Sequence, residues 1–162
     1  MPKGRRLETA PTRDWRRLPR FLEEILMPHK FPSAEWVAEF VAQINSDEEY
    51  ARAASTWEGD LNFMIEDAPG ADKPLVIYLD LWHGKCRGAR FTDEASAPAA
   101  AFKINAPLAN WRRVIAKQIG PVPAMVSGQL KVRGNLTYIL RHVRAAQQLV
   151  ECATRIDTEF PA

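Results

Sequence analysis

Apolar residues at helical spacing predict three helices in the first third of the chain. The first is a short amphipathic helix within residues 15–31, with arginines clustered at its start. Ser33 is placed to cap a second helix, whose apolar stripe consists of Trp36, Val37, Phe40, Val41 and Ile44. Ser46 precedes Glu49 by three residues, which is the spacing of a capping box, and predicts a third helix to about Ser55.

The hydrophobic period then changes to two, which predicts strands. Residues 61–66 alternate in this way, and turn-forming residues at 68–72 connect them to a second arm at 75–82. Because residues 75–82 are apolar on nearly both faces, we expect this strand in the interior of a sheet. Three further strands are predicted at 86–91, 102–104 and 130–133.

Two more helices and a helical turn are predicted in the second half of the chain. Asn105 is placed to cap the first of these helices. One face of that helix consists of Leu108, Trp111, Ile115 and Ile119. A helical turn is expected at 124–126, and the apolar spacing from Asn135 to about Ile156 predicts one long helix. Helices segregated from a largely antiparallel sheet indicate an α+β domain.

Composition narrows the class of protein. The chain has 162 residues, of which 46% are hydrophobic and 26% charged, which suits one globular domain with a sizeable core. Its net charge of +2 gives no general attraction to nucleic acid, but residues 1–32 carry eight Lys/Arg against four Asp/Glu. Cys86 and Cys152 lack metal-ligand spacing, so we expect buried thiols in a reduced cytoplasm. No apolar run reaches the ~20 residues of a membrane-spanning helix.

The residues that commonly carry chemistry form no recognisable site. His29, His83 and His142 fall on different elements, without the spacing of metal ligands. Ser127 lacks the glycine two positions earlier that a nucleophile elbow requires, and no glycine-rich phosphate loop joins a strand to a helix. We therefore predict no catalytic residue, no metal and no cofactor. Residues far apart in the sequence can meet in the fold. An enzyme with Asp80 or His142 as a buried acid or base is therefore a further alternative.

One segment of the chain resembles a known family. Residues 125–135 read Met-Val-Ser-Gly-Gln-Leu-Lys-Val-Arg-Gly-Asn. This is similar to the pattern of the sterol carrier protein type 2 family, in which a short helical turn precedes Gly-Lys-Leu-Lys-Ile-x-Gly-Asp/Asn and a long amphipathic helix. Gln129 stands where the family often has lysine. The hairpin at 57–82 and the order of the later elements extend the resemblance over about residues 33–155.

The resemblance implies a five-stranded sheet covered on one face by helices, enclosing an apolar tunnel for sterols, fatty acids, acyl-CoA or other lipids. We accordingly expect a lipid-binding domain at 33–157, a basic arm at 1–32 and a tail at 158–162. The arm either packs on the domain or contacts an anionic membrane through residues 15–31. Each candidate ligand contact is otherwise an ordinary core residue, and these candidates are Phe40, Phe63, Trp82, Phe102, Trp111, Met125, Leu136, Ile139, Leu140 and Val143.

Two functions lead among these expectations. The first is a non-enzymatic carrier that transfers a hydrophobic ligand between membranes or enzymes. The alternative is an accessory domain that presents a lipid-like intermediate, such as a polyprenylated quinone precursor, to partner enzymes. A vacant apolar cavity of ~300 Å³ would cost about 7 kcal/mol, so we expect the pocket to be partly collapsed or occupied. We also expect the last helix to line or gate the mouth of the tunnel.

Overall fold

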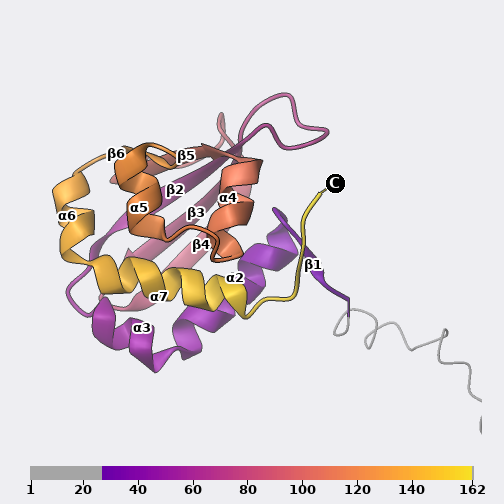
Figure 1. Ribbon diagram of the computed structural model, residues 1–162. Coiled ribbons are helices and arrows are strands. Elements are labelled where there is room, and N and C mark those ends of the chain that lie inside the picture. Colours follow the sequence, from indigo (N-terminus) through magenta and orange to yellow (C-terminus); the bar gives the residue numbers. More distant parts are fainter. Residues whose placement is uncertain (1–26, 162) are drawn as a thin grey trace, which may run out of the picture.

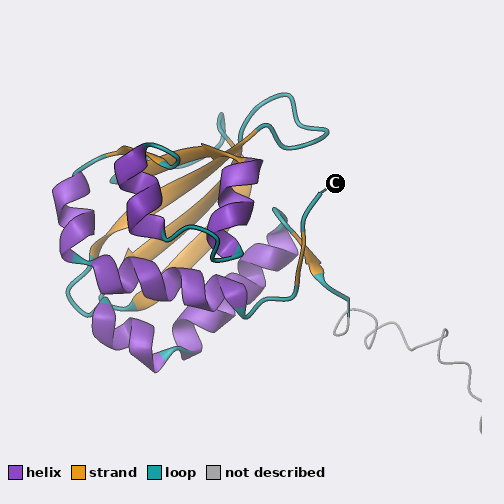
Figure 2. Ribbon diagram, in the orientation of Figure 1, coloured by secondary structure: helices purple, strands orange, loops and turns teal. Residues whose placement is uncertain are grey.

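Five strands form a mixed sheet in the computed structural model, which describes residues 27–161 (Figures 1 and 2). The sheet has the order β4-β3-β2-β5-β6. Its strands are β2 (Glu58–Glu66), β3 (Leu75–Trp82), β4 (Lys85–Asp93), β5 (Phe102–Pro107) and β6 (Lys131–Arg133). Only the pair β2 and β5 is parallel among these neighbours. The predicted α+β fold with a largely antiparallel sheet is therefore confirmed, and β3 lies inside the sheet as expected.

Helices cover one face of this sheet. In Figure 1, α4 and α5 lie in front of the strands, while α7 runs below them, next to α2 and α3. The helices are α2 (Ala34–Ser46), α3 (Glu48–Ala53), α4 (Leu108–Ile115), α5 (Pro121–Ser127), α6 (Leu136–Arg141) and α7 (Val143–Thr154). The hydrophobic core fills the space between the two layers.

The cap of α2 is confirmed and the cap of α3 is corrected. Ser33 Oγ accepts a hydrogen bond from the Trp36 N–H at 3.0 Å, as the sequence predicts. The residue that caps α3 is Asp47, whose Oδ1 accepts from the Tyr50 N–H at 3.1 Å. Ser46 cannot cap α3, because it is the last residue of α2. The predicted capping box is thus wrong by one residue.

The start and end of α4 also differ from the prediction. Asn105 belongs to β5 and does not cap the helix, because the ladder between β2 and β5 continues as far as Pro107. Pro107 occupies the cap position without a side-chain hydrogen bond. The helix ends at Ile115, although Ile119 still packs against the core.

The long helix predicted after Asn135 is broken at His142. This residue has φ −114° and ψ 40°, outside the helical region, and separates α6 from α7. Its Nδ1 donates to the carbonyl of Tyr138 at 2.9 Å, where a regular helix would place a backbone N–H. The N–H of His142 turns instead to the carbonyl of Ile139 at 2.9 Å. The side chain therefore substitutes for one backbone hydrogen bond and allows the chain to change direction.

The two ends of the described chain pair with each other. β1 (His29–Lys30) runs parallel to β7 (Thr158–Glu159), in a two-stranded sheet next to α2. Phe31 is buried in the core and contacts Phe160, with ring centroids 5.4 Å apart. The folded unit therefore extends at both ends beyond the predicted range of 33–157. Most of the helix predicted within 15–31 lies outside the described residues.

Candidate ligand-binding cavity

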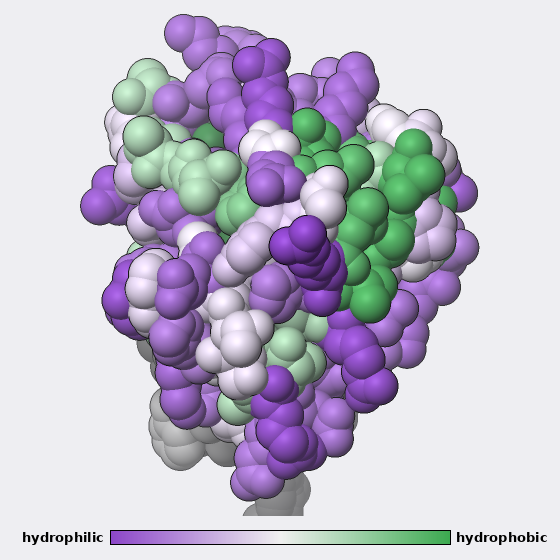
Figure 3. All heavy atoms as spheres, turned by 90° about the vertical axis from the view of Figure 1, so that its left-hand side faces the viewer, coloured by the Kyte–Doolittle hydropathy of each residue, from purple (hydrophilic) through white to green (hydrophobic). Residues whose placement is uncertain are grey.

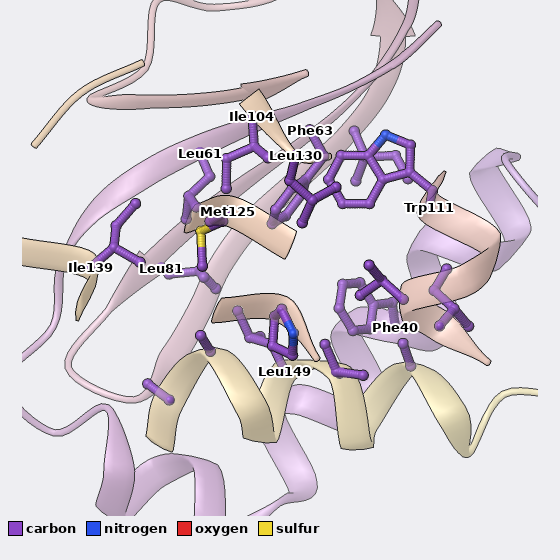
Figure 4. Close-up of a pocket in the computed structure, with 18 of the residues that line it drawn as sticks. Phe40, Leu61, Phe63, Leu81, Ile104, Trp111, Met125, Leu130, Ile139 and Leu149 are labelled. Carbon is purple, nitrogen blue, oxygen red and sulfur yellow. The ribbon is translucent and has the colours of Figure 1, made fainter. Parts of the chain in front are cut away.

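An apolar cavity of about 120 Å³ lies between the sheet and the helices (Figure 4). The sheet forms one wall with alternate residues of its strands, which point to the same face because the side-chain period of a strand is two. Leu61 and Phe63 come from β2, Leu81 from β3 and Ile104 from β5. In Figure 4, Leu149 of α7 rises toward the cavity from the opposite side.

Three tryptophans line the cavity with their rings, and each directs its polar atom elsewhere. The indole N–H of Trp36 donates to Thr158 Oγ1 at 2.9 Å. Trp57 donates to the carbonyl of Gly59 at 2.8 Å, and Trp111 donates to the carbonyl of Met64 at 3.0 Å. Because all three donors are satisfied by the protein, the rings present only apolar surface to a ligand.

Polar groups on the wall are few. Burial raises the pKa of Tyr50, with smaller contributions from Cys86 and Cys152, so its hydroxyl stays neutral. His142 has both ring nitrogens engaged, Nε2 with Thr56 Oγ1 at 3.1 Å and Nδ1 with the carbonyl of Tyr138. Within residues 27–161 there is no group of three or more His, Cys, Asp or Glu that could hold a metal ion. The cavity wall therefore presents almost no charge to a ligand.

The cavity is smaller than an ordinary ligand pocket. Small-molecule pockets usually measure ~300 Å³ or more. At ~24 cal/mol per Å³, a void of about 120 Å³ costs about 3 kcal/mol, which a domain tolerates, whereas ~300 Å³ would cost about 7 kcal/mol. The walls must therefore move apart to admit a lipid chain.

The chain and its fold have relatives among known proteins. A model of the SCP-2 sterol transfer family matches residues 38–147, which is more than half of the chain. The chain belongs to this family.

Solved structures of this SCP-2 family share the same architecture. A crystal structure of sterol carrier protein 2 is 35% identical, with a TM-score of 0.72 over 76% of this chain and 97% of its own. A conserved hypothetical protein from Thermus thermophilus, described as possibly a sterol carrier protein, is 34% identical, with a TM-score of 0.72 over 80% and 91%. Sterol carrier protein 2 from Yarrowia lipolytica, in its apo form, has 16% identity and a TM-score of 0.51 over 76% and 93%, which shows the fold alone. No curated protein matches the chain.

Half of the residues predicted from the sequence to contact a ligand line the cavity of this SCP-2 domain. They are Phe40, Phe63, Trp111, Met125 and Ile139. They come from α2, β2, α4, α5 and α6, so the fold brings together residues from across the chain. Their contact with a ligand stays a prediction.

Trp82 does not lie at the cavity, although the sequence placed it among the ligand contacts. It alternates with Leu81, which lines the cavity, so it points to the outer face of the sheet. Its side chain is 37% exposed, stacks on His83 and lies under the guanidinium of Arg87, 4.6 Å from the ring centroid.

The other four predicted contacts lie beside the cavity. Phe102 is buried at the end of the sheet, where its ring packs on Trp57 at 5.1 Å and on Tyr138 at 5.9 Å between centroids. The break at His142 changes the direction of the last helix, so the predicted stripe does not continue along α7. The cavity wall does not include Val143 on α7, nor Leu136 and Leu140 on α6, where Leu140 is 38% exposed.

Replacing Trp82 by alanine tests its placement. Because the side chain faces away from the cavity, we expect the affinity for a fluorescent fatty acid to stay within about twofold of the parent protein, as for a surface substitution. Fluorescence titration measures this affinity. A loss of more than about tenfold, which equals ~1.4 kcal/mol, would place Trp82 in the binding site after all.

Sequence reasoning missed two kinds of lining residue. The first kind shares the inward face of the strands with Phe63, and its signal was the alternation itself. These residues are Leu61, Ile65, Ile77, Leu81 and Ile104. The second kind, which carries no sequence signal because alanine suits any helix face, consists of Ala145, Ala146 and Ala153 on α7.

The two residues considered as a buried acid or base lie on opposite faces of the sheet. Asp80 lies on the outer face of the sheet, where its carboxylate pairs with Arg87 at 3.1 Å. His142 lies on the cavity wall, on the helix side. Of the two single candidates, only His142 lines the cavity, and its role as an acid or base stays a prediction.

An apolar surface patch lies next to the cavity. Figure 3 shows apolar side chains gathered on the side of the molecule that carries α6. Val126 in α5 is 66% exposed and Leu140 in α6 is 38% exposed. Each directly follows a residue that lines the cavity, Met125 and Ile139. The wall between cavity and solvent is thus one helix thick at this place.

No helix within residues 27–161 is long and apolar enough to cross a membrane.

Proposed function

We propose that this protein binds a sterol, fatty acid, acyl-CoA or related lipid in the apolar cavity and transfers it without chemical change. The observation that carries the proposal is the cavity between the sheet and the helices, which is lined almost entirely by apolar side chains. A chain of about sixteen carbons gains roughly 12 kcal/mol gross at ~0.8 kcal/mol per methylene, before the costs of association. Burial alone is therefore a sufficient driving force, and membership of the SCP-2 sterol transfer family supports this role.

We infer that the ligand enters between α5 and α6. This wall consists of single helices whose inner residues, Met125 and Ile139, line the cavity while the next residues are exposed. α5 is only seven residues long and has no side-chain cap at its N-terminus. Separation of these two helices would enlarge the cavity without disturbing the sheet.

Native mass spectrometry of the freshly purified full chain, followed by organic extraction, tests the carrier function. We expect an added mass on the protein and a matching lipid in the extract. A protein that neither retains an apolar molecule nor takes up an added fatty acid would contradict the proposal. The alternative accessory role predicts, in addition, a stable protein partner that co-elutes with the lipid-loaded chain.

A chain that lacks residues 1–26 tests the basic arm. We expect slower transfer to vesicles that contain anionic lipid, because basic residues near an anionic surface contribute ~1 kcal/mol each, while ligand affinity stays unchanged. The deletion must stop before residue 27, because Phe31 is buried in the core and His29 pairs with Thr158. Equal transfer rates to anionic and neutral vesicles in both chains would exclude a docking role for the arm.

Replacing Val126 and Leu140 together by serine tests the apolar patch. If these side chains enter a membrane during delivery, their loss should slow transfer to vesicles by about tenfold or more, at ~1.5–3 kcal/mol for each fully buried side chain. Affinity for the free ligand should change little, since neither residue lines the cavity. Stopped-flow transfer of a fluorescent fatty acid measures the rate. An unchanged rate would show that delivery does not use this patch.

A further inference from the structure

A second hollow, of about 460 Å³, lies on the opposite face of the sheet from the apolar cavity. Asn62 and Met64 form its base, and they alternate on β2 with Leu61 and Phe63, which line the cavity. The rest of the wall comes from the loop before β5 and from Lys103, Arg133 and Gly134. We call it the outer hollow.

The loop over the outer hollow is held in place by two hydrogen bonds. The side-chain Nδ2 of Asn62 donates to the carbonyl of Pro98 at 2.8 Å. The N–H of Ala101 donates to Asp60 Oδ1 at 2.8 Å. Because both anchors are on β2, the loop stands above the strands at a fixed position and the space beneath it persists.

Two cations lie side by side at one end of this hollow. Lys103 on β5 and Arg133 on β6 are direct partners in the antiparallel ladder. Like charges at directly opposed positions repel each other. No carboxylate in the described part of the chain lies within 4.0 Å of either side chain. An anion between them would relieve the repulsion.

Two acceptors also line this hollow, Asn62, which is the neighbour of Lys103 in the ladder between β2 and β5, and Glu94 in the loop. Asn62 is only 6% exposed, and its Oδ1 has no hydrogen-bond partner among the described residues. The amide cannot be turned over to remove this defect, because Nδ2 is needed for the carbonyl of Pro98. The exposed Glu94 adds a carboxylate to the wall. Both groups call for a hydrogen-bond donor, and a carboxylate favours a positively charged one.

We propose that the outer hollow binds a small zwitterion with a phosphate at one end and an ammonium at the other. The phosphate lies between Lys103 and Arg133, whose two charges match the −1.5 to −2 that a phosphate monoester carries at about pH 7. The ammonium pairs with the exposed carboxylate of Glu94. Free phosphoethanolamine is such a monoester, and the headgroup of phosphatidylethanolamine carries the same two groups, with a phosphodiester of a single negative charge.

Titration of the ¹⁵N-labelled full chain with O-phosphoethanolamine, inorganic phosphate and ethanolamine, at constant ionic strength, tests the proposal. We expect saturable shifts at residues of the outer hollow, and an affinity for O-phosphoethanolamine about tenfold above that for phosphate, the effect of one charged hydrogen bond. Equal affinities, or shifts confined to other parts of the protein, would overturn it. Asn62 itself is not replaced, because it also holds the loop.

Three substitutions separate this site from general charge attraction. Lys103→Gln and Arg133→Gln should each weaken binding of O-phosphoethanolamine by about tenfold or more. Arg90→Gln is the matched control, because Arg90 lies on the same face of the sheet, through its partner Tyr78, but outside the hollow. If Arg90→Gln weakens binding as much as Arg133→Gln, the proposal fails.

Glu94→Gln gives the sharpest signature. Removal of the carboxylate should weaken binding of O-phosphoethanolamine and strengthen binding of inorganic phosphate, since Glu94 attracts the ammonium and repels the anion. A change in the same direction for both probes would overturn the assignment of the ammonium end.

Co-sedimentation with phosphatidylcholine vesicles, with and without phosphatidylethanolamine, distinguishes the two sources of the ligand. Extra binding that Arg133→Gln abolishes and Arg90→Gln leaves intact identifies the lipid headgroup. Binding of O-phosphoethanolamine in solution without this extra sedimentation identifies a free molecule. If neither probe binds, the outer hollow is not a site for this chemistry.

Discussion

Replacement of Asp47 by alanine is expected to lower the free energy of unfolding by about 3 kcal/mol, with ~1 kcal/mol from the lost helix cap and the remainder from lost charged hydrogen bonds. Oδ1 accepts from the Tyr50 N–H at 3.1 Å. Oδ2 accepts from Gln148 at 2.9 Å, from Arg155 at 2.8 Å and from the thiol of Cys152 at 3.2 Å. One carboxylate, only 8% exposed, thereby joins the start of α3 to α7, which forms one side of the cavity.

The stabilisation by Asp47 should depend on pH. Burial alone would raise the pKa of this carboxyl, but the hydrogen bonds from Gln148, Tyr50, Cys152 and Arg155 together hold the pKa well below its ordinary value of 3.8. The unfolded chain therefore takes up the proton first as the pH falls. The contribution of Asp47 is complete above about pH 5 and decreases below about pH 4, so the difference between the parent protein and Asp47→Ala should narrow there.

Urea unfolding followed by tryptophan fluorescence measures both effects. Glu49→Ala is a suitable control, because it removes a carboxylate from the first turn of the same helix, where its partner Arg52 is exposed. We expect its unfolding midpoint to stay close to that of the parent protein at neutral pH. Equal midpoints for Asp47→Ala and Glu49→Ala would mean that the buried contacts of Asp47 contribute nothing.

Replacement of Leu149 by tryptophan is expected to abolish most of the ligand affinity while leaving the fold intact. Leu149 points from α7 into a cavity of about 120 Å³, so a bulky indole there would occupy space that a lipid needs. If the indole displaces about four methylenes of the ligand, at ~0.8 kcal/mol each, the affinity for a fluorescent fatty acid falls by about 200-fold. Fluorescence titration and a urea unfolding curve give both readouts.

Val143→Trp is the matched control for this variant. It introduces the same side chain on the same helix, but Val143 does not line the cavity. We expect its affinity to remain within about threefold of the parent protein, which equals less than ~0.7 kcal/mol. If Val143→Trp blocks uptake and Leu149→Trp does not, the ligand occupies a different space from the cavity in Figure 4.

Local patterns in the sequence predicted the structure correctly where a single short-range preference determines it. The alternation of Leu61, Phe63 and Ile65 predicted both the strand and its inward face, because the side-chain period of a strand does not depend on its neighbours. Ser33 predicted the start of α2 for the same reason, since the cap needs only its own helix. The antiparallel hairpin of β2 and β3 followed from its turn residues and from the two alternating arms.

Predictions from the sequence were wrong where a distant partner decides between two local possibilities. Asn105 suits a helix cap, but pairing of β5 with β2 places it in a strand. The apolar spacing continues past residue 142, and the break there accompanies a contact of the His142 ring with Thr56, which lies 86 positions away in the chain. After the break, α7 presents Ala145, Ala146 and Ala153 to the cavity, which the predicted single helix did not indicate.

The thiol of Cys152, which contacts Asp47, makes movement of α7 measurable with a maleimide reagent. This helix forms one side of the cavity. Burial, together with the hydrogen bond to Asp47, raises the pKa of Cys152 to about 12, so the group reacts slowly while α7 stays in place. If Cys86, the other free cysteine, is changed to serine, the rate of alkylation reports how often α7 separates from α3. If the rate of alkylation stays constant during lipid uptake, α7 does not move when the ligand enters. Entry between α5 and α6 would then be sufficient for uptake.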